Sequence, residues 1–134
     1  MDNETAKIRW WRVLLGGFLI ELALMVVAVA LFATLANPAS ALNLAVPPAT
    51  LLVAAPIAAW AARGTPRPVL AGTLTGVAAL VLYGLMTGAG YLASPGNIDL
   101  GQVFGPAYLS SHVLKLAGGA IGGWWVARRR TAAA

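Results

Sequence analysis

Long stretches without ionisable residues are the feature that most limits how this chain can fold. The stretch between Arg12 and Arg63 contains a single such residue, Glu21. The stretch between Arg67 and Asp99 contains none. Of the 134 residues, 60% are hydrophobic and 10% are charged, whereas a typical soluble domain is about 45–50% apolar and about 25% charged. A soluble fold this small would have too much surface for so few charges, so the sequence predicts an integral membrane protein.

Four apolar segments are long enough to cross a bilayer. A hydrocarbon core about 30 Å thick requires about 20 helical residues at a rise of about 1.5 Å each. The spans must be helices, because lipid offers no hydrogen-bonding partner to an open backbone. The chain is therefore expected to be an all-α membrane protein, a single domain (residues 1–134) folded as a four-transmembrane-helix bundle. The expected helices cover about residues 13–36, 42–62, 69–93 and 103–127.

Prolines set the expected ends of these helices. Asn37-Pro38 should end the first span, because the residue before a proline resists the helical conformation. Pro47 and Pro48 are expected in the first turn of the second span, where proline is tolerated. Pro56 lies inside that span and should kink it, since proline removes a backbone donor.

The basic residues predict the orientation of the chain. If there are four spans, eight of the nine lysines and arginines fall on one side, while the loops on the other side carry only Asp99. The positive-inside rule then places both termini in the cytoplasm, and all five tryptophans lie at the same membrane edge. A signal peptide is disfavoured, because the first apolar run exceeds the 7–15 residues usual in such peptides. We expect a multi-pass protein of a bacterial inner (cytoplasmic) membrane. The eight basic residues are Lys7, Arg9, Arg12, Arg63, Arg67, Arg128, Arg129 and Arg130.

The two halves of the chain resemble each other weakly. The sequence WAAR at residues 60–63 is echoed by WVAR at residues 125–128, and Asn-Pro at residues 37–38 by Ser-Pro at residues 94–95. Two tandem helical hairpins that arose by duplication would explain these echoes. Chance similarity between apolar helices would explain them equally well.

Small residues predict how the helices pack. Lipid tails are as apolar as leucine, so membrane helices associate through close backbone contact at small side chains. Glycines spaced four apart occur on the third span, and two overlapping GxxxG patterns occur on the fourth. We therefore expect these two spans in close contact. The packing glycines are Gly72, Gly76, Gly118, Gly119, Gly122 and Gly123.

Two charged residues are expected deep in the membrane. At about 1.5 Å per residue, the depths of Glu21 and Lys115 differ by about 6 Å, which a lysine side chain can span. Each charge alone would cost about 2.5–3.5 kcal/mol. The favoured interpretation is an ion pair that fixes the first span against the fourth. The alternative is that Glu21 is a proton or cation site, because protonation removes the cost of a buried carboxylate.

Three further residues share the polar side of the fourth span. His112, Tyr108 and Ser111 could contribute to a polar pathway or to pH sensing, although a partly exposed histidine near the outer surface is the simpler interpretation of His112. Ser111 precedes Lys115 by one turn, which would permit a serine–lysine nucleophile. No oxyanion motif accompanies it, so we expect no enzyme. A single histidine and the absence of cysteine predict no metal site, and no cofactor is expected.

Two resemblances follow from these residues. Residues 58–63, 72–83 and 118–123 resemble stretches of uncharacterised small four-helix bacterial integral membrane proteins, known as domains of unknown function. That resemblance covers nearly the whole chain and implies no activity. Residues 16–21 (GGFLIE) resemble the first helix of small multidrug-resistance exporters, which implies an essential glutamate at Glu21. Unlike those exporters, this chain has no tryptophan in its third span, and it has Lys115 available to neutralise the glutamate.

The sequence thus favours a non-enzymatic accessory, scaffold or oligomer-forming component of a membrane. Its expected partners are the lipid bilayer and either a second copy or another membrane protein. Nucleic acid is not expected despite the net charge of +5, because the basic residues flank the spans. The alternative function is a small proton-coupled transporter that uses Glu21 and works as an oligomer.

Overall fold

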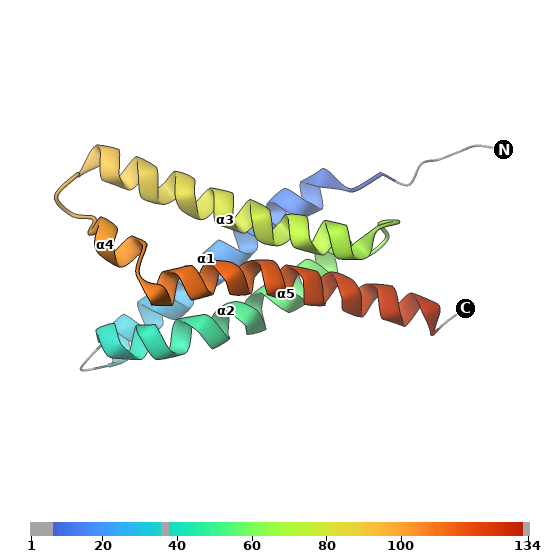
Figure 1. Cartoon of the computed structure of the whole chain (residues 1–134), viewed down its shortest axis with the longest axis horizontal. Helices are drawn as coiled ribbons and strands as arrows, with labels where there is room; N and C mark the ends of the chain where they lie inside the picture. Colours follow the sequence, from blue (N-terminus) through green and yellow to red (C-terminus); the bar gives the residue numbers. More distant parts are fainter. Residues whose placement is uncertain (1–6, 36–37, 133–134) are drawn as a thin grey trace.

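The computed structural model describes residues 7–35 and 38–132, and within those ranges the prediction of an all-α protein is confirmed. The four long helices run antiparallel from one end of the bundle to the other, and a single helical turn, α4, lies between the last two (Figure 1). The elements are α1 (Trp10–Thr34), α2 (Pro38–Ala62), α3 (Pro68–Ala93), α4 (Leu100–Val103) and α5 (Pro106–Thr131).

The second helix begins earlier than expected. Since α2 begins at Pro38, Pro47 and Pro48 lie inside the helix and not in its first turn, so the prediction for these two prolines was wrong. Each proline keeps a helical φ and removes one hydrogen bond to the carbonyl four residues back. Those carbonyls belong to Asn43 and Leu44, which are exposed residues near the α4 end of the helix. Pro56 lies within α2, as expected.

The fourth long helix is displaced along the chain. The expected span at residues 103–127 is replaced by α4 and by α5, which begins at Pro106 and continues through the arginine run to Thr131. Gly105 is extended and caps the helix, and proline at the first helical position favours a start there. No helix-breaking residue follows position 127, and positive charges stabilise the last turn of a helix.

Three of the long helices are long and apolar enough to cross a membrane, namely Trp10–Thr34, Asn43–Ala62 and Pro68–Ala93. Helix α5 has the same 26-residue length as α3 but is much less hydrophobic. Its sequence contains His112, Lys115 and three successive arginines, which lower its mean hydropathy.

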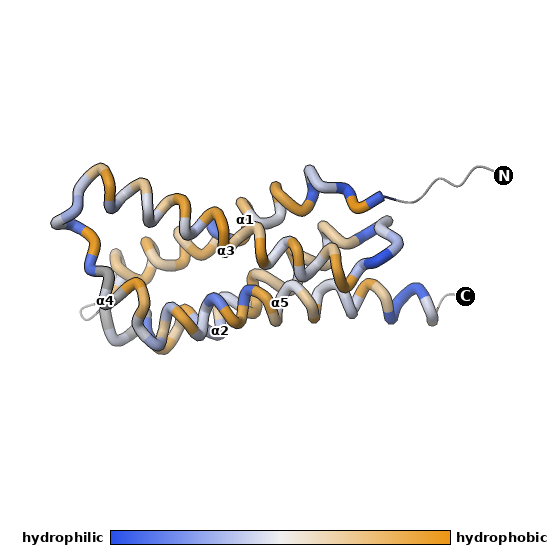
Figure 2. The backbone as a smooth tube through the Cα atoms, turned by 45° about the horizontal axis from the view of Figure 1, so that its top comes forward, coloured by the Kyte–Doolittle hydropathy of each residue, from blue (hydrophilic) through white to orange (hydrophobic). Residues whose placement is uncertain are grey.

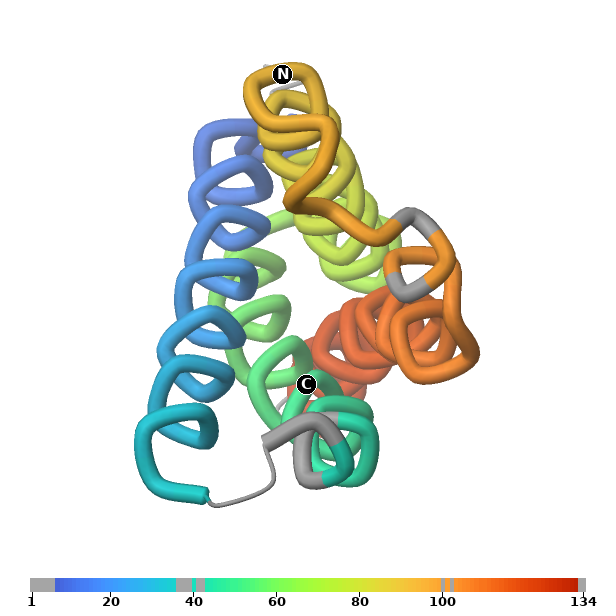
Figure 3. Tube along the Cα trace, turned by 90° about the vertical axis from the view of Figure 1, so that its left-hand side faces the viewer, coloured from blue at the N-terminus to red at the C-terminus, as the bar shows by residue number. Residues whose placement is uncertain are grey.

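The bundle is closed at one end and spread at the other. Helices α1 and α5 lie on opposite sides, and each packs against both α2 and α3. Helices α2 and α3 meet at their connecting turn and diverge toward the end that holds α4 (Figure 1). Figure 3, which looks at the α4 end, shows the same helices spread apart there. We call the end with both termini the basic end and the other the α4 end.

Glycines on two faces of α5 explain the tight packing near the basic end. A Cβ atom added to Gly119 would meet the carbonyl oxygen of Gly72 on α3, and one added to Gly123 would meet that of Pro68. The neighbouring face contacts α2, where a Cβ on Gly122 would meet the carbonyl oxygen of Ala55. The two overlapping GxxxG patterns therefore serve two different neighbours, of which the sequence predicted only α3.

Helix α1 approaches the others in the same way. A Cβ on Gly17 would lie 2.8 Å from the backbone nitrogen of Ala79, and one on Gly16 would lie 2.7 Å from a methyl group of Thr75. The fully buried side chains of this half are mostly alanine, with Ile20 as the largest. Small residues thus bring the backbones of the four long helices close together.

The basic end is held by hydrogen bonds between clusters that are distant in the sequence. Arg12 donates to the carbonyl oxygen of Arg63 at 3.1 Å, and Arg130 donates to that of Thr65 at 2.5 Å. The turn between α2 and α3 passes through Gly64, whose φ of 77° favours glycine. Figure 2 shows hydrophilic segments gathered at this end, with a second hydrophilic stretch around the α3–α4 connection.

Candidate functional site

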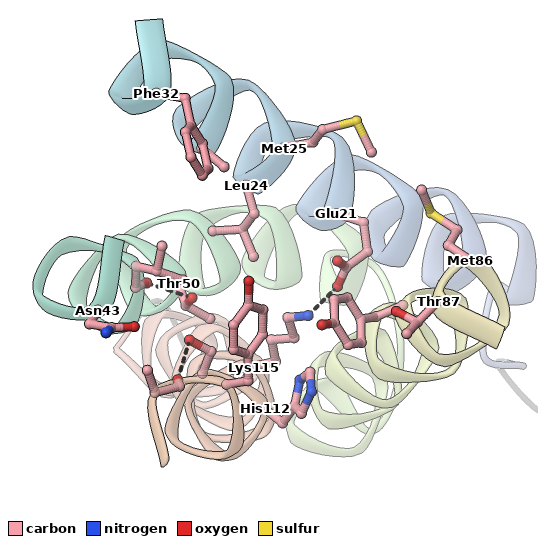
Figure 4. A pocket seen from close by; sticks show the side chains of 16 residues that line it. Glu21, Leu24, Met25, Phe32, Asn43, Thr50, Met86, Thr87, His112 and Lys115 are labelled. Atoms are coloured by element: carbon pink, nitrogen blue, oxygen red, sulfur yellow. Dashed lines mark hydrogen bonds and ion pairs between the residues drawn. The ribbon is translucent and has the colours of Figure 1, made fainter. Parts of the chain in front are cut away.

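A buried ion pair lies where the tight half of the bundle ends. The Nζ atom of Lys115 is 2.5 Å from Oε1 of Glu21, and the two side chains are 3% and 10% exposed. The pair bridges α1 and α5, which lie on opposite sides of the bundle, and the two side chains face each other in Figure 4. The sequence paired these residues from their depths alone, and the structure brings them together.

Glycines one helical turn away position both charges. Gly17 precedes Glu21 by four residues and lies against α3, while Gly119 follows Lys115 by four residues and lies against the same helix. A Cβ on Gly76 would meet the carbonyl oxygen of Lys115 at 2.5 Å. Both α1 and α5 are thus drawn onto α3 beside the charges, which makes their side chains meet.

An aromatic cluster covers the lysine. The Nζ atom of Lys115 lies 4.7 Å from the ring centroid of Tyr83 on α3, within cation–π range. The Tyr83 ring is 4.7 Å from that of His112 and 6.2 Å from that of Tyr108. The structure therefore gathers two of the three residues proposed for a polar pathway around Tyr83. The sequence analysis did not single out Tyr83 as a site residue, although it lies seven residues, or two helical turns, after Gly76, whose position contacts the backbone of Lys115.

His112 is half-buried, which agrees with the expectation of a partly exposed histidine. Its Nδ1 atom is buried and has no hydrogen-bond partner among the described residues. An unpartnered buried polar atom in a native fold calls for an explanation such as a bound water or ligand. The imidazole nitrogen is thus available to contact a small molecule bound beside it.

A cavity of about 430 Å³ lies between the four long helices, on the α4 side of the ion pair (Figure 4). Its volume is within the range of small-molecule sites. Glu21 and Lys115 form part of its wall, and α1 contributes apolar side chains. The other helices add hydroxyl, amide and imidazole groups. These polar lining residues are Asn43, Thr50, Tyr83, Thr87, Tyr108, Ser111 and His112.

The cavity does not continue toward the basic end. On the basic-end side of the ion pair there is a cluster with no exposed surface, formed by Ile20, Ala54 and Ala79. On α1 the lining begins at Glu21 and continues away from the basic end to Phe32. The site is therefore a chamber with a sealed, glycine- and alanine-packed floor, and its two charges lie at that floor.

The serine–lysine arrangement does not form a nucleophile. The hydroxyl of Ser111 donates to the carbonyl oxygen of Ala107 at 3.1 Å, and the Lys115 ammonium pairs with Glu21. In the part of the chain that the structure describes, no group of three or more histidine, cysteine, aspartate or glutamate residues could hold a metal ion.

Comparison with known proteins identifies no relative. No family model matches the chain, and no curated protein or solved structure matches it either. The resemblances to small four-helix membrane proteins and to small multidrug-resistance exporters therefore stay predictions. The function has to be argued from the geometry of the site.

Proposed function

We propose that this chain is a four-span protein of a bacterial inner membrane, with the basic end in the cytoplasm. Helix α5 packs along α2 and α3, both of which are apolar enough to span. At about 1.5 Å per residue its 26 residues reach about 39 Å, enough to cross with them. Its glycines face those helices, and its one buried charge is paired. The eight basic residues, which flank the helices at the basic end, favour a cytoplasmic location for both termini.

Within that frame, the protein is a non-enzymatic binder of a small solute, which enters the cavity from the side opposite the cytoplasm. One observation supports this function above all others: the Glu21–Lys115 pair, although buried, forms part of the wall of a cavity. A purely structural pair would be expected to be surrounded by side chains. Here tyrosine, histidine and threonine groups converge on it from three helices.

The pair also suits coupling of solute movement to protons. A proton that reaches Glu21 neutralises the carboxylate and releases the Lys115 ammonium, which can then attract an anionic or strongly polar group of the solute. Departure of the proton re-forms the pair and displaces the solute. This cycle makes the protein a proton-coupled transporter, in which opening of the sealed floor would complete the passage.

Cavity-filling variants test the binding proposal. Purified protein is screened for small polar and amphipathic compounds that raise its melting temperature. Binding should be lost in Thr87→Trp and in Ala28→Trp, which fill the cavity from α3 and α1, and kept in Val81→Trp, whose side chain is exposed on α3. A compound that stabilises all three variants equally binds elsewhere, and the proposal would fail if every hit behaved so.

Flux measurements then test the coupling. A confirmed ligand should enter proteoliposomes faster when an inward proton gradient is imposed. In Glu21→Gln protein whose circular dichroism shows the folded helices, this acceleration should be abolished. An unchanged gradient-driven rate in Glu21→Gln would remove Glu21 from the mechanism.

A second candidate is an accessory or oligomer-forming membrane protein. Gly84 and Gly88 on α3 favour it, because a Cβ on either would meet nothing within 4 Å, so this small-residue pair is free to contact a helix of another protein or a second copy. Gentle purification from native membrane followed by mass spectrometry distinguishes the two candidates. A stable partner that is lost in Gly84→Leu/Gly88→Leu supports the accessory role, and a lone chain that binds solute supports transport.

A further inference from the structure

A second concave site lies at the basic end, between α2 and α5. This groove, of about 450 Å³, has an apolar wall that includes Pro56, Ala59 and Val126. Its rim is formed by the exposed side chains of Arg63 and Arg129, together with Arg130. The groove is separate from the cavity at the α4 end, and the two share no lining residue.

The groove has the polarity gradient of a phospholipid. Pro56 precedes Arg63 by seven residues, so the apolar wall reaches about 10 Å along α2 away from the charged rim. In the membrane orientation proposed above, the rim lies at the cytoplasmic surface and the wall faces the hydrocarbon. A headgroup phosphate would meet the arginines while an acyl chain follows the wall.

Two of the three arginines are held in place by contacts within the protein. The Arg129 guanidinium lies 4.4 Å from the ring centroid of Trp125, and Arg130 donates to the carbonyl oxygen of Thr65. Among the described residues, no carboxylate forms an ion pair with Arg63, Arg129 or Arg130. Three cations with no carboxylate partner among the described residues, two of them held in place, favour a phosphate, which guanidinium groups bind in bidentate fashion.

We propose that this groove binds one anionic phospholipid from the cytoplasmic leaflet. The proposal rests on the membrane orientation given above and not on the solute cavity. Basic pockets between membrane helices on the cytoplasmic side are a recognised setting for anionic headgroups. The bound lipid would join α2 to α5 at the end where the helices pack most closely.

Native mass spectrometry of the detergent-purified protein, titrated with phosphatidylglycerol or phosphatidylcholine, tests the proposal. The wild type should retain one phosphatidylglycerol and no phosphatidylcholine. Each basic residue at a membrane surface contributes about fivefold in affinity, so Arg63→Gln/Arg129→Gln should bind about 30-fold more weakly. The matched control Arg67→Gln/Arg128→Gln removes two charges from the same end but outside the groove, and it should bind like the wild type.

Three results would overturn the proposal. Equal losses in the two double variants would mean that diffuse charge, and not the groove, attracts the lipid. Displacement of the lipid by millimolar inorganic phosphate would identify a phosphate site with no role for the acyl wall. A gain of more than tenfold in lipid affinity in Asp2→Asn/Glu4→Gln would mean that the acidic N-terminal segment is the natural occupant. The solute-binding screen and the flux assay would be untouched by any of these.

Discussion

Removing one or the other member of the ion pair should make the stability of the protein depend on pH in opposite directions. In Lys115→Met, Glu21 is left without its 2.5 Å partner in a site where its side chain is 10% exposed. Leaving one charge of a buried pair uncompensated costs about 3–5 kcal/mol. The carboxyl group can avoid that cost by taking up a proton, and this sets an upper limit on the destabilisation.

The limit follows from the titration of glutamate in water, which loses its proton near pH 4.3. At about 1.36 kcal/mol per pH unit, holding the proton costs about 3.7 kcal/mol at pH 7 and about 1 kcal/mol at pH 5. The folded variant then binds one more proton than the unfolded chain, so its stability falls as the pH rises. Water in the cavity would solvate the carboxylate and lower both figures.

Glu21→Gln should behave in the opposite way. Lys115 is then the unpaired group, and its uncompensated buried ammonium costs about 3–5 kcal/mol. Higher pH favours the neutral amine over the charge that the site penalises, so the stability of this variant should rise with pH. The double variant Glu21→Gln/Lys115→Met carries neither charge and should be nearly independent of pH and more stable than either single variant.

The assay is reversible unfolding of the purified protein in mixed micelles by a denaturing detergent, followed by circular dichroism at pH 5, 6, 7 and 8. The wild type and the double variant serve as references at each pH. Parallel pH profiles for the two single variants would refute the reasoning, because they would show that neither charge depends on the other in the folded protein.

Three further predictions use the same unfolding assay. Gly119→Ala should destabilise the protein by about 1–3 kcal/mol, because its Cβ would meet the Gly72 carbonyl, whereas Gly84→Ala should be neutral or slightly stabilising; equal effects would contradict the packing of α3 against α5. Tyr83→Leu should cost about 0.5–2 kcal/mol through loss of the ring over Lys115, and Tyr83→Phe should keep most of that stability; a full loss in Tyr83→Phe would assign the effect to the hydroxyl. The charge swap Glu21→Lys/Lys115→Glu should restore expression that each single change loses, and failure of this rescue would argue against a mainly structural pair.

Much of the fold follows from local features of the sequence. Apolar length set the number of long helices, and the depth arithmetic paired Glu21 with Lys115 because both residues count from a helix end marked by arginine. The contact between the third and fourth spans followed from glycine spacing. These inferences need only the helical rise and the identity of nearby residues, so they can be made without knowledge of the tertiary structure.

The remaining features depend on contacts between distant segments. Pro47 and Pro48 are compatible with either a helix start or a helix interior, and only the placement of α2 decides between them. The second glycine face of α5 could be recognised as a packing surface only once the structure showed α2 beside it. The cavity arises because the helices diverge toward the α4 end, beyond a floor of small residues. Such a divergence depends on how the helices pack together, so it cannot be predicted from the sequence of any one helix. The sequence analysis therefore did not predict that Asn43 and Thr50 on α2 line the cavity.

Single-cysteine labelling in intact membranes tests the central claim, a membrane bundle whose cavity opens away from the cytoplasm, most directly. The natural chain contains no cysteine, so each variant reports one position. A membrane-impermeant thiol reagent added from outside should label Ser94→Cys in the α3–α4 connection and Thr87→Cys in the cavity. It should miss Val81→Cys on the lipid-facing surface, and it should reach Thr131→Cys only after permeabilisation. Labelling of Ser94→Cys and Thr131→Cys from the same side, or of Thr87→Cys only from the cytoplasm, would contradict the account.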